Sequence, residues 1–143
     1  MSALIPVTAE CVFQAADYQK IPMPIILGLL KTEGGHVGGV SVNTNGSKDL
    51  GPIQINDRVW VPILAKMHFG GDQGAAYEAL RDNGCYNIHV GAWIFHQYVE
   101  EAGGNMAEAV GLYNSHTPVH KQAYQRRFIQ NFMALFGGIL NRK

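Results

Sequence analysis

The chain has 143 residues, 47% of them hydrophobic, so it can bury a core as one domain without metals or many cross-links. Its eleven basic and eleven acidic residues cancel, which argues against nucleic acid or an anionic bilayer as a partner, because each favours a basic excess. The longest apolar run, Pro24 to Leu30, is much shorter than the roughly 18 to 20 residues that cross a bilayer, so no transmembrane segment is expected.

We expect a single domain over residues 1–143, with residues 1–7 as an N-terminal extension of the kind that a trimmed leader leaves. Thr8 is placed to cap a first helix that reaches about Lys20. The prolines at positions 22 and 24 then end that helix.

A second helix is predicted from Ile25 to Glu33, with Pro24 suited to its first turn and Gly34-Gly35 as its stop. Residues 36–56 carry no helical period. Within them, the alternation of Val40-Ser41-Val42 and the hairpin-turn pair Asn45-Gly46 indicate a small, irregular β-region.

Helical signals return after residue 56. Asp57 precedes a helix with Pro62 in its early turns, and Asp72 is placed to cap a short helix that reaches about Arg81. Asn83-Gly84 is expected to break that helix.

Another helix is predicted where apolar and amphipathic residues follow helical spacing, at Val90, Trp93, Ile94, Gln97 and Tyr98. Asn105 with Glu108 forms a capping-box-like start for a helix that reaches about Tyr113. Together the elements predict a mainly α fold with one small β-region.

Thr117-Pro118 opens a long final helix with Arg126-Arg127 on its polar face. Its apolar stripe consists of Phe128, Ile129, Phe132, Met133, Phe136 and Ile139. This stripe predicts packing on the domain, and the alternative is a docking surface for a partner.

Glu33 is predicted to point inward. Counting about 100° per residue from Ile25, the apolar side chains of the second helix cover an arc of roughly 140°, and Glu33 falls inside it. Desolvation and the negative end of the helix dipole both disfavour the ionised form, so we expect a raised pKa. Such an acid suits protonation of a glycosidic oxygen. The alternative is a half-exposed Glu whose tip reaches water past a frayed helix end.

The segment after Glu33 is rich in glycine. Six lie within eighteen residues: Gly34, Gly35, Gly38, Gly39, Gly46 and Gly51. They would let the backbone approach a bound sugar closely, or would form a flexible loop. Gln54, flanked by Ile53 and Ile55, is predicted to be buried and to need either a backbone group or a substrate hydroxyl as partner.

The remaining candidates for chemistry are sparse. Cys11 and Cys85 lack the CxxC spacing of a metal or redox site, which leaves two buried thiols or one disulfide open. His116 and His120 lie four residues apart with no third ligand nearby, so we expect no metal and no cofactor. Trp60 and Trp93 are interpreted as core or groove-wall residues.

Four segments occur in an order typical of one enzyme family. They are Glu33 with Val42–Gly46, Asp49–Asn56, Cys85–Ile94, and Ala109–Ser115. From about Cys11 to Tyr124 the chain resembles the soluble lytic transglycosylases, in the branch of peptidoglycan-cleaving enzymes that serve secretion systems, conjugation machines and pili. The resemblance implies a lysozyme-like fold, with helices around a small β-region and a glycan-binding groove.

The resemblance also implies a mechanism. Glu33 would be the single acid/base: it would protonate the glycosidic bond after N-acetylmuramic acid (MurNAc) and then accept a proton from the C6 hydroxyl of that sugar, giving a 1,6-anhydro end. An intramolecular hydroxyl has a high effective concentration and replaces the water of a hydrolase. The acetamido group of the substrate would replace the second carboxylate of a retaining glycosidase.

Carried over position by position, Gly51 and Gln54 correspond to the family's Gly-x-x-Gln motif, and Asn56 is expected to line the same groove. Tyr113 and Asn114 correspond to the Tyr-Asn pair beside the acid. Tyr113 would orient Glu33 or would be a core residue, while Asn114 would bind substrate or serve as a helix C-cap.

Asp49 is a candidate second carboxylate. Facing the groove, it would stabilise positive charge on the sugar or position a water, which gives hydrolysis with Glu33. The alternative is ordinary turn chemistry beside a glycine-rich segment.

Three departures from the family pattern stand out: Gly34 where Ser usually follows the acid, Pro52 in the Gly-x-x-Gln motif, and His116 where Gly is common. The Gly34 change leaves open a catalytically weakened peptidoglycan-binding scaffold. The relatives also pair cysteines that match Cys11 and Cys85, which implies a disulfide and an oxidising periplasm. The implied partners are glycan strands and components of a secretion, conjugation or pilus apparatus.

Overall fold

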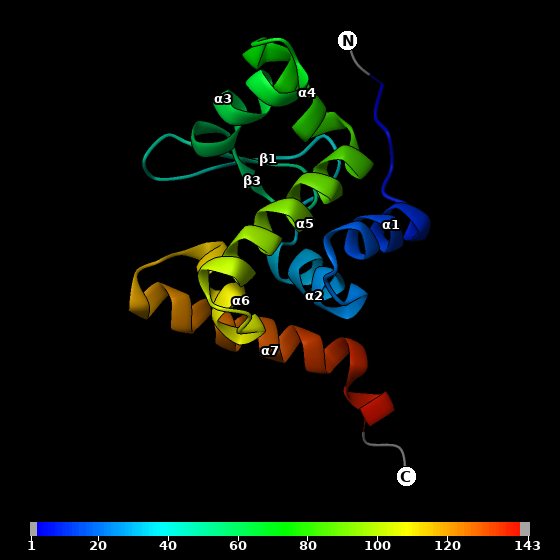
Figure 1. The fold of residues 1–143 in the computed structure, drawn as a ribbon, viewed down its shortest axis with the longest axis vertical. Coiled ribbons are helices and arrows are strands. Elements are labelled where there is room, and N and C mark those ends of the chain that lie inside the picture. The colour runs from blue at the N-terminus through cyan, green and yellow to red at the C-terminus, as the bar shows by residue number, and fades with distance from the viewer. Residues whose placement is uncertain (1–2, 141–143) are drawn as a thin grey trace. The chain divides into compact units, whose positions relative to one another are not determined.

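The computed structural model describes residues 3–140, with the side chains of residues 139 and 140 outside the description. Its helices are α1 (Ala9–Gln19), α2 (Met23–Glu33), α3 (Asp57–His68), α4 (Gln73–Asp82), α5 (Gly84–Glu101), α6 (Met106–Asn114) and α7 (Pro118–Leu140), and its strands are β1 (Val40–Val42), β2 (Lys48–Leu50) and β3 (Ile55–Asn56) (Figure 1). The mainly α fold with one small β-region, predicted from the sequence, is confirmed.

The chain forms two compact units, and each is built from two separate segments. The first comprises the chain up to Val12 together with Glu33–Gly91, and the second comprises Phe13–Thr32 together with the chain from Ala92 onward. The boundaries therefore fall inside α1, α2 and α5. That the whole chain folds as one cooperative domain stays a prediction.

The three strands of the first unit form an antiparallel sheet in the order β1-β2-β3. Asp49 of β2 lies opposite Ser41 of β1 and Asn56 of β3. In the turn between β1 and β2, the Asn43 N–H donates to the Ser47 carbonyl at 2.8 Å and Gly46 adopts a φ of 84°. The hairpin that Asn45-Gly46 predicted is therefore present.

Side-chain caps begin three helices where the sequence predicted them. Each cap oxygen accepts a hydrogen bond from the N–H group three residues on: Thr8 Oγ1 from Cys11 at 3.1 Å, Asp72 Oδ1 from Ala75 at 3.0 Å, and Asn105 Oδ1 from Glu108 at 3.0 Å. These bonds satisfy N–H groups that have no partner inside the helix.

Three helix starts differ from the prediction, and the first is α2, which begins at Met23 rather than Ile25. Asn56, not Asp57, caps α3, because its Oδ1 accepts from the Val59 N–H at 3.2 Å while Asp57 is already helical. The largest difference is α5, which begins at Gly84 rather than near Val90. Asn83 Oδ1 accepts from the Tyr86 N–H at 3.0 Å, so the break after α4 is also the cap of the next helix.

Cys11 of α1 and Cys85 of α5 are joined by a disulfide, with their Cα atoms 5.7 Å apart. The chain before α1 also contacts this region. The Ile5 N–H donates to the Asp82 carbonyl at 2.9 Å, and the Gly84 N–H donates to the Ile5 carbonyl at 2.7 Å. The N-terminal segment of the first unit is thus held both by a covalent bond and by backbone pairing.

In the second unit, α7 buries only part of its apolar stripe. Tyr124 and Phe128 are almost fully buried, and a Cβ at Gly28 of α2 would lie 2.6 Å from the Phe128 ring. Ile129 is 58% exposed and Met133 is 44% exposed, so the prediction that the whole stripe packs is wrong at these two positions. They lie about 100° or more around the helix from Phe128, beyond the face that α2 covers. The predicted stripe residue Ile139 lies outside the described side chains.

Asn87 of α5 is completely buried in the first unit and makes three hydrogen bonds to the backbone. Its Oδ1 accepts from the Ile53 N–H, and its Nδ2 donates to the carbonyls of Leu50 and Leu80, each at 2.9 Å. A buried amide of this kind fixes the segments that it joins, because any other position would leave polar groups without partners. Residues 50–53 are therefore fastened to both α4 and α5.

Replacing Asn87 with Ala should lower the free energy of unfolding by about 2 to 4 kcal/mol, because one N–H and two carbonyls lose their partner in the core. The change is measured by urea unfolding. Gln97→Ala on the same helix is the control, since Gln97 is half-buried and makes only a 3.5 Å contact, and it should cost less than about 1 kcal/mol. Equal losses from the two variants would contradict the anchoring role.

Candidate active site

Glu33 is the last residue of α2, and it is half-buried. The helix stops there because Gly34 adopts a left-handed conformation with a φ of 66°, as the Gly34-Gly35 pair predicted. No atom lies within 4 Å of the place where a Gly34 Cβ would stand. A serine at this position would therefore have room, but the backbone would be strained by about 1 kcal/mol.

Gly35 brings the chain after Glu33 into contact with the turn that follows β2. A Cβ on Gly35 would overlap the Gly51 carbonyl oxygen, and it would lie 2.7 Å from Gln54 Nε2 and 2.9 Å from the Pro52 carbonyl oxygen. Only glycine permits this approach without movement of the backbone. The structure thus places three of the predicted site residues, Glu33, Gly51 and Gln54, along one pair of touching segments.

Gln54 is half-buried rather than buried, and its backbone has a φ of 59°, which is unusual for a residue other than glycine. Both its backbone N–H and its Nε2 donate to the Gly51 carbonyl, at 3.2 Å and 3.0 Å. The prediction of burial was wrong because the positive φ takes the residue out of strand geometry. The sequence left open whether the Gln54 side chain bonds to a backbone group or to a substrate hydroxyl. In the structure its partner is the backbone carbonyl of Gly51. Strain of this kind clusters at functional sites.

Gly51 is the counterpart of Gly35 in this contact. It is buried, has a φ of 70°, and has so little space that a Cβ would lie 2.6 Å from the Leu80 carbonyl oxygen. Its N–H donates to the Gly39 carbonyl at 3.0 Å. Of the glycines that the sequence singled out, Gly35 and Gly51 are therefore needed for close packing rather than for flexibility.

Asp49 lies in strand β2 and is half-buried, so its interpretation as a turn residue was wrong. Asn56 Nδ2 donates to Asp49 Oδ1 at 3.1 Å and to Ser47 Oγ at 3.0 Å, while Asn56 Oδ1 caps α3. The structure brings Asp49 and Asn56 together, and it uses the whole Asn56 amide within the chain.

Tyr113 and Asn114 are the last two residues of α6, in the second unit. Tyr113 is half-buried and Asn114 is exposed. Asn114 is not the C-cap, since Ser115 has the extended backbone of a cap and donates its N–H to the Gly111 carbonyl. Tyr113 meets Tyr98 of α5 edge to face, with ring centroids 6.4 Å apart.

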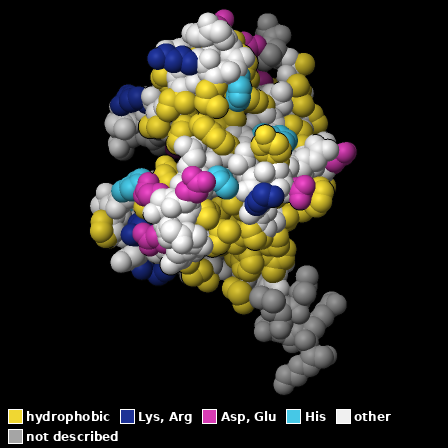
Figure 2. Space-filling model, in the orientation of Figure 1, with side chains coloured by type: hydrophobic (Ala, Val, Ile, Leu, Met, Phe, Trp, Pro, Cys, Tyr) yellow, Lys and Arg dark blue, Asp and Glu magenta, His cyan; other side chains and the backbone are white. Residues whose placement is uncertain are grey.

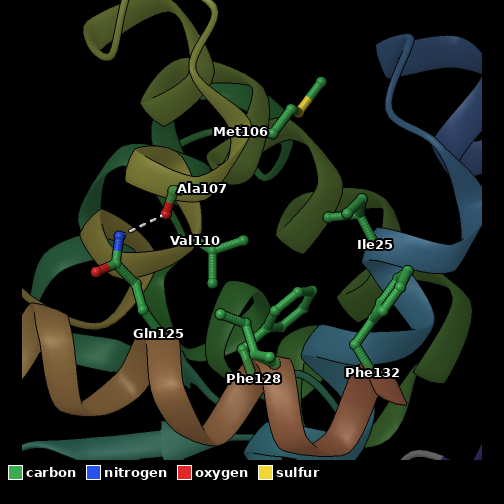
Figure 3. A pocket seen from close by; sticks show the side chains of 8 residues that line it. Ile25, Met106, Ala107, Val110, Gln125, Phe128 and Phe132 are labelled. Carbon is green, nitrogen blue, oxygen red and sulfur yellow. Dashed lines mark hydrogen bonds between the residues drawn. The ribbon is translucent and has the colours of Figure 1, made fainter. Parts of the chain in front are cut away.

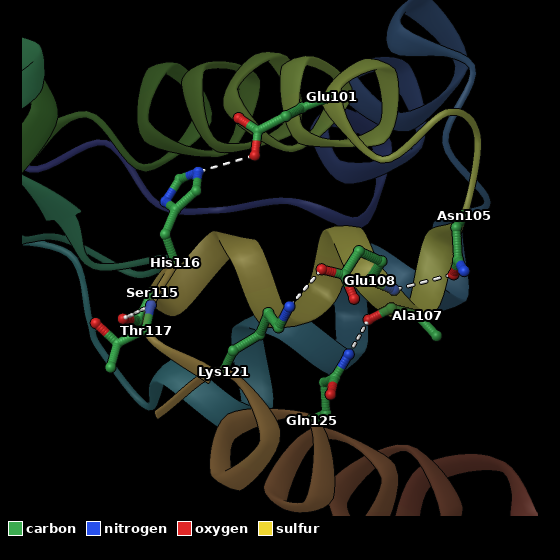
Figure 4. Close-up of polar contacts among 9 residues, drawn as sticks. All are labelled: Glu101, Asn105, Ala107, Glu108, Ser115, His116, Thr117, Lys121 and Gln125. Atoms are coloured by element: carbon green, nitrogen blue, oxygen red, sulfur yellow. Dashed lines mark hydrogen bonds and ion pairs between the residues drawn. The ribbon is translucent and has the colours of Figure 1, made fainter. Parts of the chain in front are cut away.

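The loop after Tyr113-Asn114 is tied to α5 by His116. His116 Nε2 lies 2.8 Å from Glu101 Oε2 (Figure 4), and the His116 ring meets Tyr98 with centroids 5.8 Å apart. Burial and, secondarily, the charge of Glu101 raise the pKa of Tyr98. His116 stands out in the sequence only as a departure from the family pattern, whereas the structure gives it a contact that holds this loop.

Sequence reasoning gave no role to Asn87, which fixes the turn containing Gly51 and Gln54. The available signal was a polar residue inside the apolar spacing of α5. Within residues 3–138, no group of three His, Cys, Asp or Glu residues is placed to hold a metal ion. Glu33, at the end of α2, is a carboxyl group of the kind that acts in proton transfer.

The glycine contact predicts a difference between neighbouring substitutions. Gly35→Ala should cost about 2 to 4 kcal/mol of unfolding free energy, because the new methyl group overlaps backbone that Asn87 holds in place. Gly34→Ala should cost only about 1 kcal/mol, since the space is open and the cost is backbone strain alone. Both are measured by urea unfolding. A Gly35→Ala variant as stable as Gly34→Ala would show that the contact does not constrain the site.

Comparison with known proteins matches these features to one family. The family described as Transglycosylase SLT domain matches residues 10–135. Two proteins named Protein IpgF, from Shigella flexneri and Shigella sonnei, are each 30% identical to the chain over 124 residues, which is 86% of this chain and 76% of the relative. No helix in the described part of the chain is long and apolar enough to span a membrane. The matched region contains Glu33, the Gly51–Gln54 turn and the Tyr113-Asn114 pair, and the chain belongs to the transglycosylase SLT domain family.

Proposed function

We propose that the protein is a lytic transglycosylase that cleaves the β-1,4 bond between MurNAc and N-acetylglucosamine in peptidoglycan and leaves 1,6-anhydroMurNAc ends. Membership of the SLT family supports action on peptidoglycan. The observation that supports the finer proposal is the contact of Gly35, two residues after Glu33, with the Gly51–Gln54 turn; the proposal requires the Glu33 carboxyl group to lie beside this hydrogen-bonding backbone.

In this mechanism Glu33 first donates its proton to the glycosidic oxygen as the bond to the leaving sugar breaks. Glu33 is half-buried at the carboxyl end of α2, and the raised pKa that the sequence led us to expect there stays a prediction. The acetamido oxygen of MurNAc stabilises the developing positive charge. The C6 hydroxyl then attacks C1, and the Glu33 carboxylate accepts its proton. Glu33 regains from the C6 hydroxyl the proton that it gave to the glycosidic oxygen. No water is needed, so one carboxyl group is sufficient.

The other site residues support binding of the sugar in this proposal. Gly51 and Gln54 present carbonyl and amide groups, and Gln54 exchanges its bond to Gly51 for one to a sugar hydroxyl. Asn56 holds Asp49, because its amide hydrogens are already donated to Asp49 and Ser47, so we propose that it contributes to chemistry only in the hydrolytic candidate below. An orienting role for Tyr113 and substrate binding by Asn114 rest on the family motif and stay predictions.

The proposed setting is the periplasm, where the enzyme would open the cell wall locally for an envelope-spanning machine. This part of the proposal rests on the resemblance to the specialised branch of the family. The disulfide between Cys11 and Cys85 supports it, since such bonds persist in oxidising compartments.

Hydrolysis is the second candidate, and the observation that favours it is the placement of Asp49. This carboxylate lies in a strand and is held by Asn56 at 3.1 Å, a fixed position that suits the positioning of a water. A hydrolase would leave reducing ends where a lytic transglycosylase leaves anhydro ends.

Glu33→Gln should reduce the yield of anhydro products from purified peptidoglycan by about a thousandfold or more, because the amide can neither donate nor accept the proton. Products are counted by mass spectrometry. Glu100→Gln is the control, since Glu100 is an exposed helix residue, and its yield should equal that of the parent. If Glu33→Gln kept the parental yield, the assigned acid/base would be wrong.

Asp49→Asn separates the two chemistries. For a lytic transglycosylase, the anhydro yield should stay within about threefold of the parent, because no step uses this carboxylate. For a hydrolase, products with reducing ends dominate in the parent and fall by about a hundredfold in the variant. The same mass-spectrometric assay reads both outcomes.

A further inference from the structure

An apolar pocket of about 370 Å³ lies within the second unit (Figure 3). It is formed by α2, α6 and α7, and the side chains that line it include Ile25, Met106, Val110, Phe128, Ile129 and Phe132. In Figure 3 the Val110 side chain projects from α6, and the Phe128 and Phe132 side chains project from α7, with Phe132 on the side of Ile25. None of the residues assigned above to the glycan chemistry lines this pocket.

The pocket offers almost no polar surface to a sugar. Its one polar side chain, Gln125, already donates from Nε2 to the Ala107 carbonyl at 2.7 Å. A saccharide placed here would lose hydrogen bonds to water without replacing them, which is costly. The occupant must therefore present an apolar group.

The apolar surface continues along α7 beyond the pocket. Ile129, which lines the pocket, is 58% exposed, and Met133, one turn further on, is 44% exposed. Hydrophobic side chains gather over α2 and α7 in the space-filling view (Figure 2). A pocket followed by a ridge with a spacing of four residues fits the apolar face of another helix, whose own anchors repeat every three to four residues.

The charge around the pocket specifies that helix further. The sequence from Pro118 to Lys143 contains no Asp or Glu, and the exposed Arg126 lies three residues before Ile129 on the same side of α7. On the other side, Met106 and Ala107 belong to the first turn of α6, where the helix dipole is positive. The acid of that turn, Glu108, is paired with Lys121 at 2.5 Å. Both sides of the pocket thus favour carboxylates.

We propose that this pocket and the Ile129-Met133 ridge form a docking site for an amphipathic helix of another protein, with a large apolar anchor flanked by acidic residues. The anchor fills the hollow, and the acidic flank meets Arg126 and the start of α6. A flat lipid surface would leave the hollow empty. The site is separate from the Glu33 chemistry, so its failure and the failure of the proposed function are distinguishable.

The test uses a stapled helical peptide with Leu at positions one turn apart and Glu on both flanks, and a matched peptide with Lys in place of each Glu. Fluorescence anisotropy with the full chain should give at least about tenfold tighter binding for the Glu peptide. Arg126→Glu should weaken that binding about tenfold, whereas Arg127→Glu, turned about 100° around α7, should change it less than twofold.

A second pair of variants tests the apolar part. Ile129→Asp should abolish binding of the Glu peptide, and Ile63→Asp, at a 42% exposed isoleucine of α3, should leave it unchanged. Cleavage of purified peptidoglycan by all four variants should match the parent, because none of these residues belongs to the proposed catalytic site.

Three outcomes would overturn the docking site. One is equal affinity in either comparison: the parent binds the Glu and Lys peptides equally tightly, or the Glu peptide binds the parent and Ile129→Asp equally tightly. Another is self-association in sedimentation velocity that Ile129→Asp removes, which would make the occupant a second copy of this chain. The third is retention on vesicles of phosphatidylcholine and phosphatidylglycerol that Arg126→Glu removes, which would make it a membrane surface.

Discussion

The buried amide of Asn87 is the constraint on which the first unit depends. Its three bonds join the end of β2, the turn after it and the last part of α4, and no other geometry would satisfy the same groups in a dry interior. Once residues 50–53 are fixed in this way, the position of the Gly51 carbonyl is fixed as well. That carbonyl receives both the backbone N–H and the Nε2 of Gln54, so the polar face of the candidate site is a consequence of a side chain that never meets substrate.

Glycine then connects the turn to the candidate acid. Because Gly35 has no side chain, the chain leaving α2 lies directly on Gly51, two residues after the candidate acid at the helix end. The departure at Gly34 has its own physical reason: a left-handed residue ends α2 with little strain only when it is glycine. The loss of the usual serine hydroxyl and the sharp end of the helix are therefore two aspects of one substitution.

Features that depend on neighbours in sequence were predictable, and features that depend on distant partners were not. Thr8, Asp72 and Asn105 cap helices as expected, and Asn45-Gly46 turns the hairpin, because these bonds span three or four residues. Asn87 reaches a partner 37 positions away, and no local pattern encodes that contact. The helical spacing of α7 identified an apolar stripe. How much of that stripe α2 and α6 cover depends on tertiary packing, which the spacing does not show. In the structure Ile129 and Met133 remain exposed to solvent.

The division of the chain into two units has a consequence for how the protein can change. Each unit draws on two stretches of sequence, and the crossings fall within α1 and α5 and at the last residue of α2 rather than in linkers. A truncation at the crossing in α1 or α5 would cut a helix in two, and a truncation at any crossing would remove part of both units, so neither unit can be excised as one contiguous segment.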